Sequence, residues 1–220
     1  MDRSKFLSQS MTAVGEMLDT IGALPPGKLA DLPADKTALV IVDMVNGFVT
    51  EGPLSSPRVA GLIPAIVKLQ QAMVERQMPI IVFGDCHEPN SVEFEAYPPH
   101  CMAFSNESKV IPEIEAVGGY RRFPKRSTNG YLEPAFQAWL AENPTITNFV
   151  LVGDCTDICI LQLATTLKTH FNVNGKRSRI IVPVDAVETF DAPGHHGDLL
   201  HLFALINMRG NAIDLVSTLQ

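Results

Sequence analysis

Two cysteines lie four residues apart in one short segment, Gly-Asp-Cys155-Thr-Asp-Ile-Cys159, which follows an apolar run. A thiol acts as a nucleophile when its pKa is lowered or when a base takes its proton. The Thr-Asp pair between the cysteines is typical of a turn that begins a helix, where partial positive charge and free N–H groups lower a thiol pKa. The segment therefore predicts a reactive cysteine with a lowered pKa, in preference to a buried structural one.

Carboxylates follow three further apolar runs, at Asp43, Asp85 and Asp185, and a fourth, Asp154, directly precedes the first of the two cysteines. Any one of these carboxylates alone would be explained as a helix cap or a solvated turn. Four of them, with a thiol directly after two, indicate an active site that several strands build jointly.

The segment after the second apolar run also carries side chains that bind metals. Asp85 and His87 are one residue apart, so both side chains point to the same side of an extended chain. With His100 they offer one carboxylate and two imidazoles, a set that suits zinc, iron or manganese with open positions for water. A lone histidine here is more often structural, but Asp-x-His together with Pro-Pro-His favours a metal site.

The elements that must position these residues alternate along the chain. Apolar runs rich in β-branched residues, typical of strands covered on both faces, occur at 38–42, 79–83, 148–153 and 179–184. Apolar residues at helical spacing occur at 63–73, 160–167 and 199–208. This alternation predicts a three-layer α/β/α fold with a mostly parallel sheet, in which ligands bind beyond the carboxyl ends of the strands.

The first 36 residues do not follow this alternation. The segment from Phe6 to Leu18 has the pattern of an amphipathic helix, and Leu24-Pro-Pro-Gly27 ends it. We therefore predict an N-terminal helical arm at 1–36 and a single α/β domain at 37–220. The arm is expected to pack on the outside of the domain or on a neighbouring subunit, and the sequence leaves both alternatives open.

Composition argues against several classes of function. The 220 residues include 24 acidic and 17 basic side chains, a net charge of -7, and this lack of a basic surplus predicts no nucleic-acid partner. No apolar stretch reaches about 18 residues, so no membrane span is expected, and the N-terminus does not resemble a secretory signal. Four cysteines are too few for a secreted disulfide scaffold, so free thiols and a cytoplasmic location are predicted.

Three motifs together carry a resemblance to a known family. Asp43 after Val-Ile-Val, Lys125 after Phe-Pro, and the segment from Gly153 to Cys159 stand in the order found in the cysteine hydrolases of the isochorismatase-like superfamily. The resemblance runs from about residue 38 to the C-terminus and implies the Rossmann-like fold of that family. Within the family, the segment 85–101 is similar to the metal site of the nicotinamidase (pyrazinamidase) branch.

The resemblance implies a role for each matching residue of the reaction centre. Cys159 matches the nucleophile, Asp43 the base that takes the thiol proton and later delivers it to leaving ammonia, and Lys125 an ammonium between their charges. The backbone N–H groups of Cys155 and Cys159 match the donors that receive the oxyanion. A cis peptide bond is implied between Asp154 and Cys155.

The resemblance also implies a metal centre and a pocket for a flat ring. The implied ligands of the divalent ion are Asp85, His87, His100 and, as a fourth, Glu93. Zinc is the first choice for this ion, with iron and manganese as alternatives. Phe48 and Tyr97 match aromatic residues that sandwich the substrate ring, and Tyr131 matches an aromatic residue that closes the pocket.

These matches predict an amidase that cleaves nicotinamide, a small amide, to nicotinate and ammonia through a thioester on Cys159, in a homo-oligomer as is usual in the family. Three alternatives stay open: a cysteine hydrolase of a carbamoyl or ureido compound, vinyl-ether hydrolysis of the isochorismatase type, which does not need the cysteine, and a non-catalytic protein on this fold. Val45 stands where the family often has glutamine, and Cys86 where an aromatic or small residue is common. Cys101 has no implied role.

Overall fold

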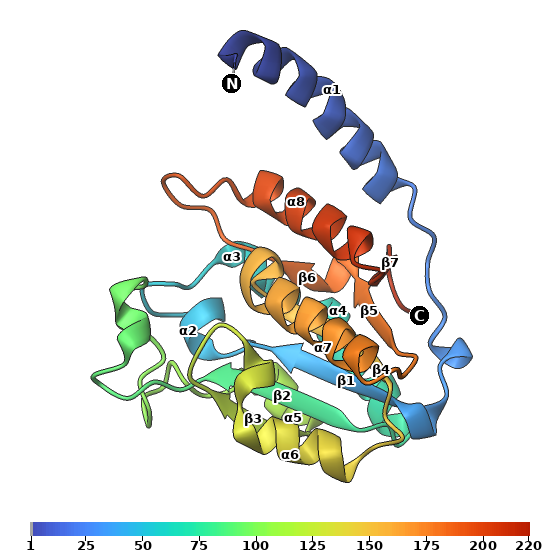
Figure 1. The fold of residues 1–220 in the computed structure, drawn as a ribbon. Helices are drawn as coiled ribbons and strands as arrows, with labels where there is room; N and C mark the ends of the chain where they lie inside the picture. The colour runs from blue at the N-terminus through green and yellow to red at the C-terminus, as the bar shows by residue number, and fades with distance from the viewer. Residues whose placement is uncertain (1) are drawn as a thin grey trace.

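A parallel sheet of seven strands runs through the middle of the molecule in the computed structural model, which describes residues 2–220 (Figure 1). The strands are β1 (Thr37–Val42), β2 (Ile80–Asp85), β3 (Arg121–Lys125), β4 (Asn148–Asp154), β5 (Arg179–Pro183), β6 (Val187–Glu188) and β7 (Asp214–Val216). Their order is β3-β2-β1-β4-β5-β7, and β6 pairs with the last residues of β4. All pairings between these strands are parallel.

Helices cover both faces of the sheet. The helices are α1 (Arg3–Gly22), α2 (Asn46–Val49), α3 (Pro57–Ala60), α4 (Ile63–Glu75), α5 (Pro112–Val117), α6 (Pro134–Glu142), α7 (Leu161–Val173) and α8 (Gly197–Gly210). One core contains buried residues of α6, α7 and α8, and the core on the opposite face contains those of α3, α4 and α5 (Figure 1). The predicted three-layer fold is confirmed.

The central strands are apolar except at their end residues because both of their faces are buried. In β1, Ala38, Val40 and Val42 contribute to one core, whereas Leu39 and Ile41 contribute to the other. Alternate residues of a strand point to opposite faces, so a strand between two helical layers has no polar side. This is why the predicted runs at 38–42, 79–83, 148–153 and 179–184 correspond to β1, β2, β4 and β5.

Strand β3 was not among the strands predicted from the sequence. Residues 121–125, which include two arginines as well as Lys125, pair with β2 at the edge of the sheet. Pro124 is tolerated there because an edge strand needs hydrogen bonds on one side only. Alternation along β3 buries Phe123 and Lys125 and exposes the residues between and before them. Lys125 is therefore fully buried, at 0% exposure.

The N-terminal segment has two parts that pack differently. Helix α1 has no buried side chain, contacts α8 and rises away from the rest of the molecule (Figure 1). Farther along, Leu29 and Leu32 are buried in the core, and Arg76 donates hydrogen bonds to the backbone carbonyls of both. The chain thus joins the core at Leu29, before residue 36. The division between arm and domain at residue 36 stays a prediction. Within residues 2–220, neither α1 nor any other helix has the length and apolarity needed to cross a membrane.

The carboxyl ends of β1, β2, β3 and β4 lie side by side at one edge of the sheet. Gly153, near the end of β4, has φ of 111°, and a Cβ at this position would lie 2.0 Å from the carbonyl oxygen of Val42 in β1. Only glycine therefore allows β4 to run this close to β1. As a result, the residues that follow these two strands emerge next to each other.

Candidate active site

Three side chains singled out from the sequence meet beyond the strand ends. Nζ of Lys125, at the end of β3, lies 3.0 Å from Oδ2 of Asp43, which follows β1, and 3.8 Å from Sγ of Cys159. Cys159 belongs to a π-helical turn, Thr156–Ile160, that joins β4 to α7. All three side chains are buried. The parallel order of the sheet thus brings a carboxylate, an ammonium and a thiol together from distant parts of the chain.

Lys125 holds two buried carboxylates. Besides Asp43 it pairs with Asp85, and it donates a hydrogen bond to the backbone carbonyl of Ser127 at 3.0 Å. Burial lowers the pKa of an amine, but the charges of Asp43 and Asp85 outweigh burial and keep the pKa of Lys125 well above its usual value. Lys125 is therefore charged, and it is the cation that both carboxylates share.

The two carboxylates have different proton affinities. Burial raises the pKa of Asp43 to about 7, the charge of Asp85 adds to the rise, and Lys125 opposes it. Burial also disfavours charge on Asp85, but Lys125 and the imidazoles of His100 and His87 beside it hold its pKa well below the usual range. Asp85 thus stays charged, whereas Asp43 exchanges a proton near neutral pH, as a general base does.

The thiol of Cys159 does not have the lowered pKa that its place at a helix start predicted. Burial raises its pKa well above the ordinary value, and the charges of Asp43 and Asp85 add to the rise, against the opposing charge of Lys125. The prediction was wrong because it counted the helix end and the ammonium but not the loss of water around the sulfur. The resting thiol is protonated, so a base must take its proton before it can attack.

Two histidines from the C-terminal part of the chain hold the turn that carries Cys159. Oγ1 of Thr156 lies 2.9 Å from Nδ1 of His201 in α8. Oδ2 of Asp157 lies 2.9 Å from Nε2 of His195, in the loop before α8. The position of the thiol is thus fixed by contacts on the side of the turn away from the strands.

Cys155 differs from Cys159 in its surroundings, although its side chain also reaches the cavity. The Asp154–Cys155 peptide bond is cis, as the resemblance implied. The thiol lies 3.7 Å from Oδ2 of Asp154, and burial, followed by the charge of Asp154, raises its pKa well above the ordinary value. Its backbone carbonyl accepts from the N–H groups of Ile158 and Ile160. The Cys155 thiol thus faces a carboxylate, and no cation stands beside it as Lys125 stands beside Cys159.

Four side chains could hold a metal ion beside this centre. Ligand atoms of Asp85, His87, Glu93 and His100 all lie within 4.8 Å of one another. Nε2 of His87 and Nε2 of His100 lie 3.4 Å and 3.3 Å from the same oxygen, Oδ2 of Asp85. The structure therefore brings together the four residues that the sequence singled out as ligands.

The two histidines are oriented as metal ligands are. Nδ1 of His100 donates to the backbone carbonyl of Pro98 at 2.8 Å, which leaves Nε2 free for a metal. Nδ1 of His87 lies 3.4 Å from the hydroxyl of Ser91. The Nε2 atom of His87 is buried and makes no hydrogen bond within the described residues. A buried nitrogen without a partner, facing a carboxylate and a second imidazole, fits a metal site.

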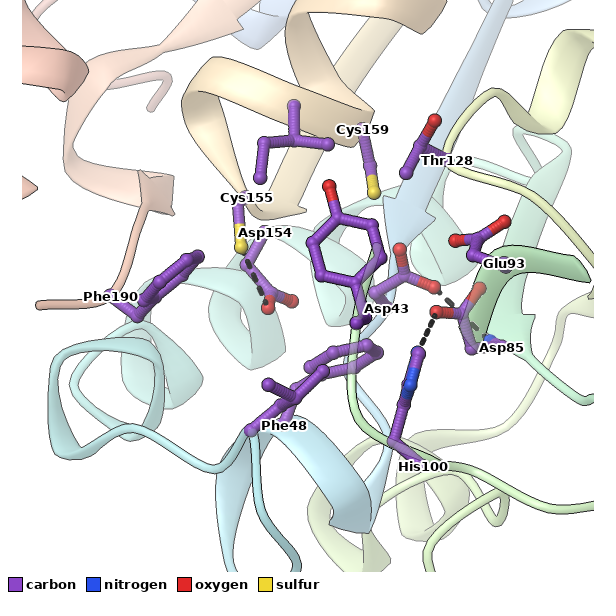
Figure 2. Close-up of a pocket in the computed structure, with 13 residues that line it drawn as sticks. Asp43, Phe48, Asp85, Glu93, His100, Thr128, Asp154, Cys155, Cys159 and Phe190 are labelled. Carbon is purple, nitrogen blue, oxygen red and sulfur yellow. Dashed lines mark hydrogen bonds and ion pairs between the residues drawn. The ribbon is translucent and has the colours of Figure 1, made fainter. Parts of the chain in front are cut away.

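A cavity that is partly open to solvent lies over these groups (Figure 2). Its lining includes the thiol of Cys159 and the rings of Phe48 and Tyr97. The centroids of these two rings lie 5.6 Å and 6.2 Å from that of His100. Two of the three aromatic residues expected at the substrate are thus beside the candidate metal ligands.

The third aromatic residue, Tyr131, is not brought to this cavity. Asn129 caps a short helix, Gly130–Leu132, and the Tyr131 ring packs against Phe136. Its hydroxyl lies 2.8 Å from Nδ1 of His170 in α7. Thr128, from the same loop, lines the cavity in its place. The expectation that Tyr131 closes the pocket is corrected by the path of this loop.

The remaining cysteines and Val45 do not join the centre. All four cysteines are free thiols, as predicted, and Cys86 is half-buried and outside the ligand cluster. Val45 and Cys101 are fully buried and pack with Phe48 in a small apolar cluster. Val45, where the family often has glutamine, therefore supports the ring of Phe48 from behind.

Some residues of the cavity were not singled out as binding residues. Leu54, Thr128, Ile158 and Phe190 line it, in addition to Asp154. Ile158 and Asp154 lie inside the motif around Cys159 and could have been found there. Leu54 and Phe190 lie in irregular segments with no periodic signal, so their place depends on the path of the loops.

Residues 37–214 match the Isochorismatase domain family. The chain belongs to the isochorismatase family. Within the family, this protein is 29% identical to Nicotinamidase 1 of Arabidopsis thaliana, in an alignment of 218 positions that covers 83% of this chain and 86% of the plant protein. The predictions of the family and of a hydrolase acting on amide C–N bonds are confirmed.

Two solved structures are similar to this isochorismatase-family protein. N-carbamoylsarcosine amidase from Thermoplasma acidophilum is 26% identical, with a TM-score of 0.69 over 82% of this chain and 95% of the other. The pyrazinamidase of Pyrococcus horikoshii, solved in complex with zinc, is 20% identical, with a TM-score of 0.67 over 82% of this chain and 98% of the other. At 20% identity, the similarity to the Pyrococcus horikoshii protein shows a shared fold only.

Proposed function

We propose that this protein hydrolyses nicotinamide to nicotinate and ammonia through a thioester on Cys159. The observation that carries the proposal is the meeting of Asp43, Lys125 and Cys159 at one cavity with four side chains that suit a metal. Phe48 and Tyr97 add aromatic walls beside those ligands, on which a flat ring stacks well. The similarity to Nicotinamidase 1 of Arabidopsis thaliana supports this substrate.

Asp43 and Cys159 carry out the covalent steps. Asp43 takes the thiol proton as the sulfur attacks the amide carbon, and the carbonyl electron pair moves to oxygen. The backbone N–H groups of Cys155 and Cys159 receive this oxyanion. As the C–N bond breaks, Asp43 returns the proton to the leaving nitrogen, and ammonia departs. Water then attacks the thioester, one of its protons passes through Asp43 to the sulfur, and the acid is released and loses its remaining proton to solvent as nicotinate.

Lys125 neutralises the negative charge on both sides of this proton transfer. The ammonium contacts both Asp43 and Cys159, so the negative charge stays beside it whether it resides on the carboxylate or on the sulfur. A buried charge that moves between two atoms next to one fixed cation needs little reorganisation of its surroundings. Lys125 is therefore proposed to lower the barrier without touching the substrate.

The chemistry of the donors suits a divalent ion held by Asp85, His87, Glu93 and His100. When bound, the ion supplies an electrophilic position that accepts the ring nitrogen of a pyridine. Two imidazoles and two carboxylates suit zinc, iron or manganese. The pyrazinamidase of Pyrococcus horikoshii, solved with zinc, favours zinc among the three.

A carbamoyl or ureido compound is the second candidate substrate. The observation in its favour is the likeness to N-carbamoylsarcosine amidase from Thermoplasma acidophilum, at 26% identity. The thiol, its base and the ammonium serve either amide equally well. A ureido compound without a ring would leave the aromatic walls at Phe48 and Tyr97 without a partner, so we rank it below nicotinamide.

Removal of the metal tests the choice between these substrates. Dialysis against a chelator should raise KM for nicotinamide before it lowers kcat, because the covalent steps need only the thiol, its base and the oxyanion donors. The His100→Ala variant should behave in the same way. Ammonia release is measured across nicotinamide, benzamide, which lacks the ring nitrogen, and N-carbamoyl compounds. Benzamide should be a poor substrate for the metal-loaded protein.

Equal cleavage of benzamide and nicotinamide would contradict the nicotinamidase proposal, as would a protein that takes up no metal from any supplement. Faster release of ammonia from an N-carbamoyl compound would favour the second candidate. Glu133→Gln serves as the matched control, since this buried carboxylate pairs with Arg126 away from the cavity and its loss should leave KM unchanged.

We also propose that α1 pairs with α1 of a second copy. Its apolar residues recur at alternating steps of four and three, the repeat of a two-helix seam: Leu7, Met11, Val14, Leu18 and Ile21. None of them is buried and Met11 is 80% exposed, whereas Ile21, at the C-terminal end of α1, also packs against the core of this chain. The first turn carries Arg3 and Lys5, whereas Glu16 and Asp19 lie near the other end. Antiparallel pairing of two copies would therefore bring opposite charges together while covering the apolar seam.

Light scattering should give a mass of at least twice 24.0 kDa at micromolar concentration. Met11→Glu combined with Leu18→Glu should lower the mass, because a buried charge in the seam is costly. Thr12→Glu, on the outer face of the same helix, is the control and should leave the assembly intact. A mass of 24.0 kDa for the unchanged chain would refute self-association.

A further inference from the structure

The loop between β6 and α8 brings one aromatic side chain to the cavity. Phe190 lies in this loop and lines the cavity. Figure 2 shows it beside Cys155 and Asp154, at the side opposite to Asp85, Glu93 and His100. The candidate metal ligands and Phe190 thus stand at two ends of one cavity, and Cys159 reaches it between them.

The ring of Phe190 is fixed by His195. The two rings stack with centroids 3.9 Å apart and an interplanar angle of 9°. Nδ1 of His195 lies 2.9 Å from the backbone carbonyl oxygen of Phe190, and Nε2 lies 2.9 Å from Oδ2 of Asp157. Asp157 is two residues before Cys159 in the π-helical turn. The ring is therefore tied, through one imidazole, to the same turn that carries the thiol.

Arg58, in α3, anchors the loop on both sides of Phe190. Its Nε donates to the backbone carbonyl of Thr189 at 3.0 Å, and its Nη2 pairs with Glu188 at 3.0 Å. On the other side, Nη1 of Arg58 pairs with Asp191 at 3.2 Å. The residue before Phe190 and the residue after it are thus both held by one guanidinium, so the position of the ring is built into the structure.

We propose that Phe190 is a specificity-determining residue that restricts the enzyme to primary amides. This inference rests on the proposed function, which places the substrate ring at the metal ligands and its amide carbon at Cys159. Any substituent on the amide nitrogen would then point towards the far end of the cavity, where Phe190 lies. A nitrogen that carries only hydrogen fits against this ring, whereas an alkyl group on the nitrogen collides with it. Ammonia, rather than an alkylamine, is therefore the leaving group that the cavity admits.

The test compares two substrates on the same protein preparations. Nicotinamide and its analogue with one methyl group on the amide nitrogen are offered to the unchanged enzyme and to the Phe190→Leu and Phe190→Ala variants. The readout is the ratio of kcat/KM for the methylated amide to kcat/KM for the primary amide. Partial unfolding or a loosened loop lowers both values together and cancels in this ratio.

The ratio should rise by roughly 10-fold or more in Phe190→Ala, the scale on which an apolar pocket discriminates one methyl group, and by less in Phe190→Leu. Phe203→Ala removes a partly exposed ring of α8 that does not line the cavity, and its ratio should equal that of the unchanged enzyme. An unchanged ratio in Phe190→Ala would overturn the inference and leave the proposed function standing. If the unchanged enzyme cleaves another primary amide but not nicotinamide, the proposed substrate fails, and the ratio is measured with that amide and its N-methyl form. If the enzyme turned over no primary amide, both the proposed function and the inference about Phe190 would be refuted.

Discussion

Cys159→Ala should lower kcat for nicotinamide by roughly 10⁴-fold or more, the scale on which covalent hydrolases lose their nucleophile. Cys155→Ala should keep activity within about 10-fold, because its proposed contribution is a backbone N–H that the substitution retains. The surroundings of the two thiols explain the difference. Cys159 has the ammonium of Lys125 at 3.8 Å, whereas the thiol of Cys155 faces the carboxylate of Asp154 at 3.7 Å. A thiolate therefore forms beside a cation at the first position, whereas at the second position it forms beside a carboxylate.

Steady-state ammonia release measures the loss, and mass spectrometry of acid-quenched enzyme locates the acyl group. The unchanged enzyme should carry a nicotinoyl adduct on Cys159, and Cys159→Ala should carry none. The half-buried Cys86, replaced by alanine, is the matched control for removal of a thiol outside the cluster. An adduct on Cys155, or equal loss of activity in both cysteine variants, would reassign the nucleophile.

Lys125→Met should destabilise the fold as well as abolish activity. The substitution leaves the buried carboxylates of Asp43 and Asp85 without their shared cation. Removing one partner from a buried ion pair costs about 3–5 kcal/mol, which lowers Tm of a chain of this size by roughly 6–20 °C. Thermal unfolding in the presence of a chelator measures this shift without a contribution from bound metal.

A second variant separates charge from packing in this prediction. When Asp43→Asn and Asp85→Asn accompany Lys125→Met, no buried charge lacks a partner, so most of the lost Tm should return while activity stays absent. Lys168→Met is the control, since this lysine contacts only the carbonyl of Ser178 among the described hydrogen bonds. A Tm for Lys125→Met equal to that of the unchanged protein would show that the carboxylates do not depend on Lys125.

The sheet was predictable from the sequence only where strands are buried on both faces. Such strands, β1, β2, β4 and β5, are apolar except at their end residues, and their runs stand out. Edge strand β3 contains Arg121, Arg122, Pro124 and Lys125, and its sequence does not differ from that of a basic loop. Strands β6 and β7 have two and three residues, too few to show any period. Pairing with a neighbour, and not local preference, makes these segments strands.

Motif order identified the residues of the candidate site, but it could not describe their environment. The basic residues around Lys125 gave no sign that its side chain is fully buried, because strand pairing decides which way that side chain points. The pKa of Cys159 was expected to be low and is high, because burial depends on the whole fold. The stacking of Phe190 on His195 could not be predicted either, since it results from a loop path that no local pattern specifies.

The close contact at Gly153 makes the spacing of the reaction centre a property of the sheet. With no side chain between β4 and β1, Asp43 and the turn after Asp154 start about one strand spacing apart, ~4.8 Å. Loops around the cavity can then change in length and sequence without altering the path of the proton between base and thiol. A single backbone frame of this kind can thus acquire new amide substrates through its loops while the proton transfer itself is inherited unchanged.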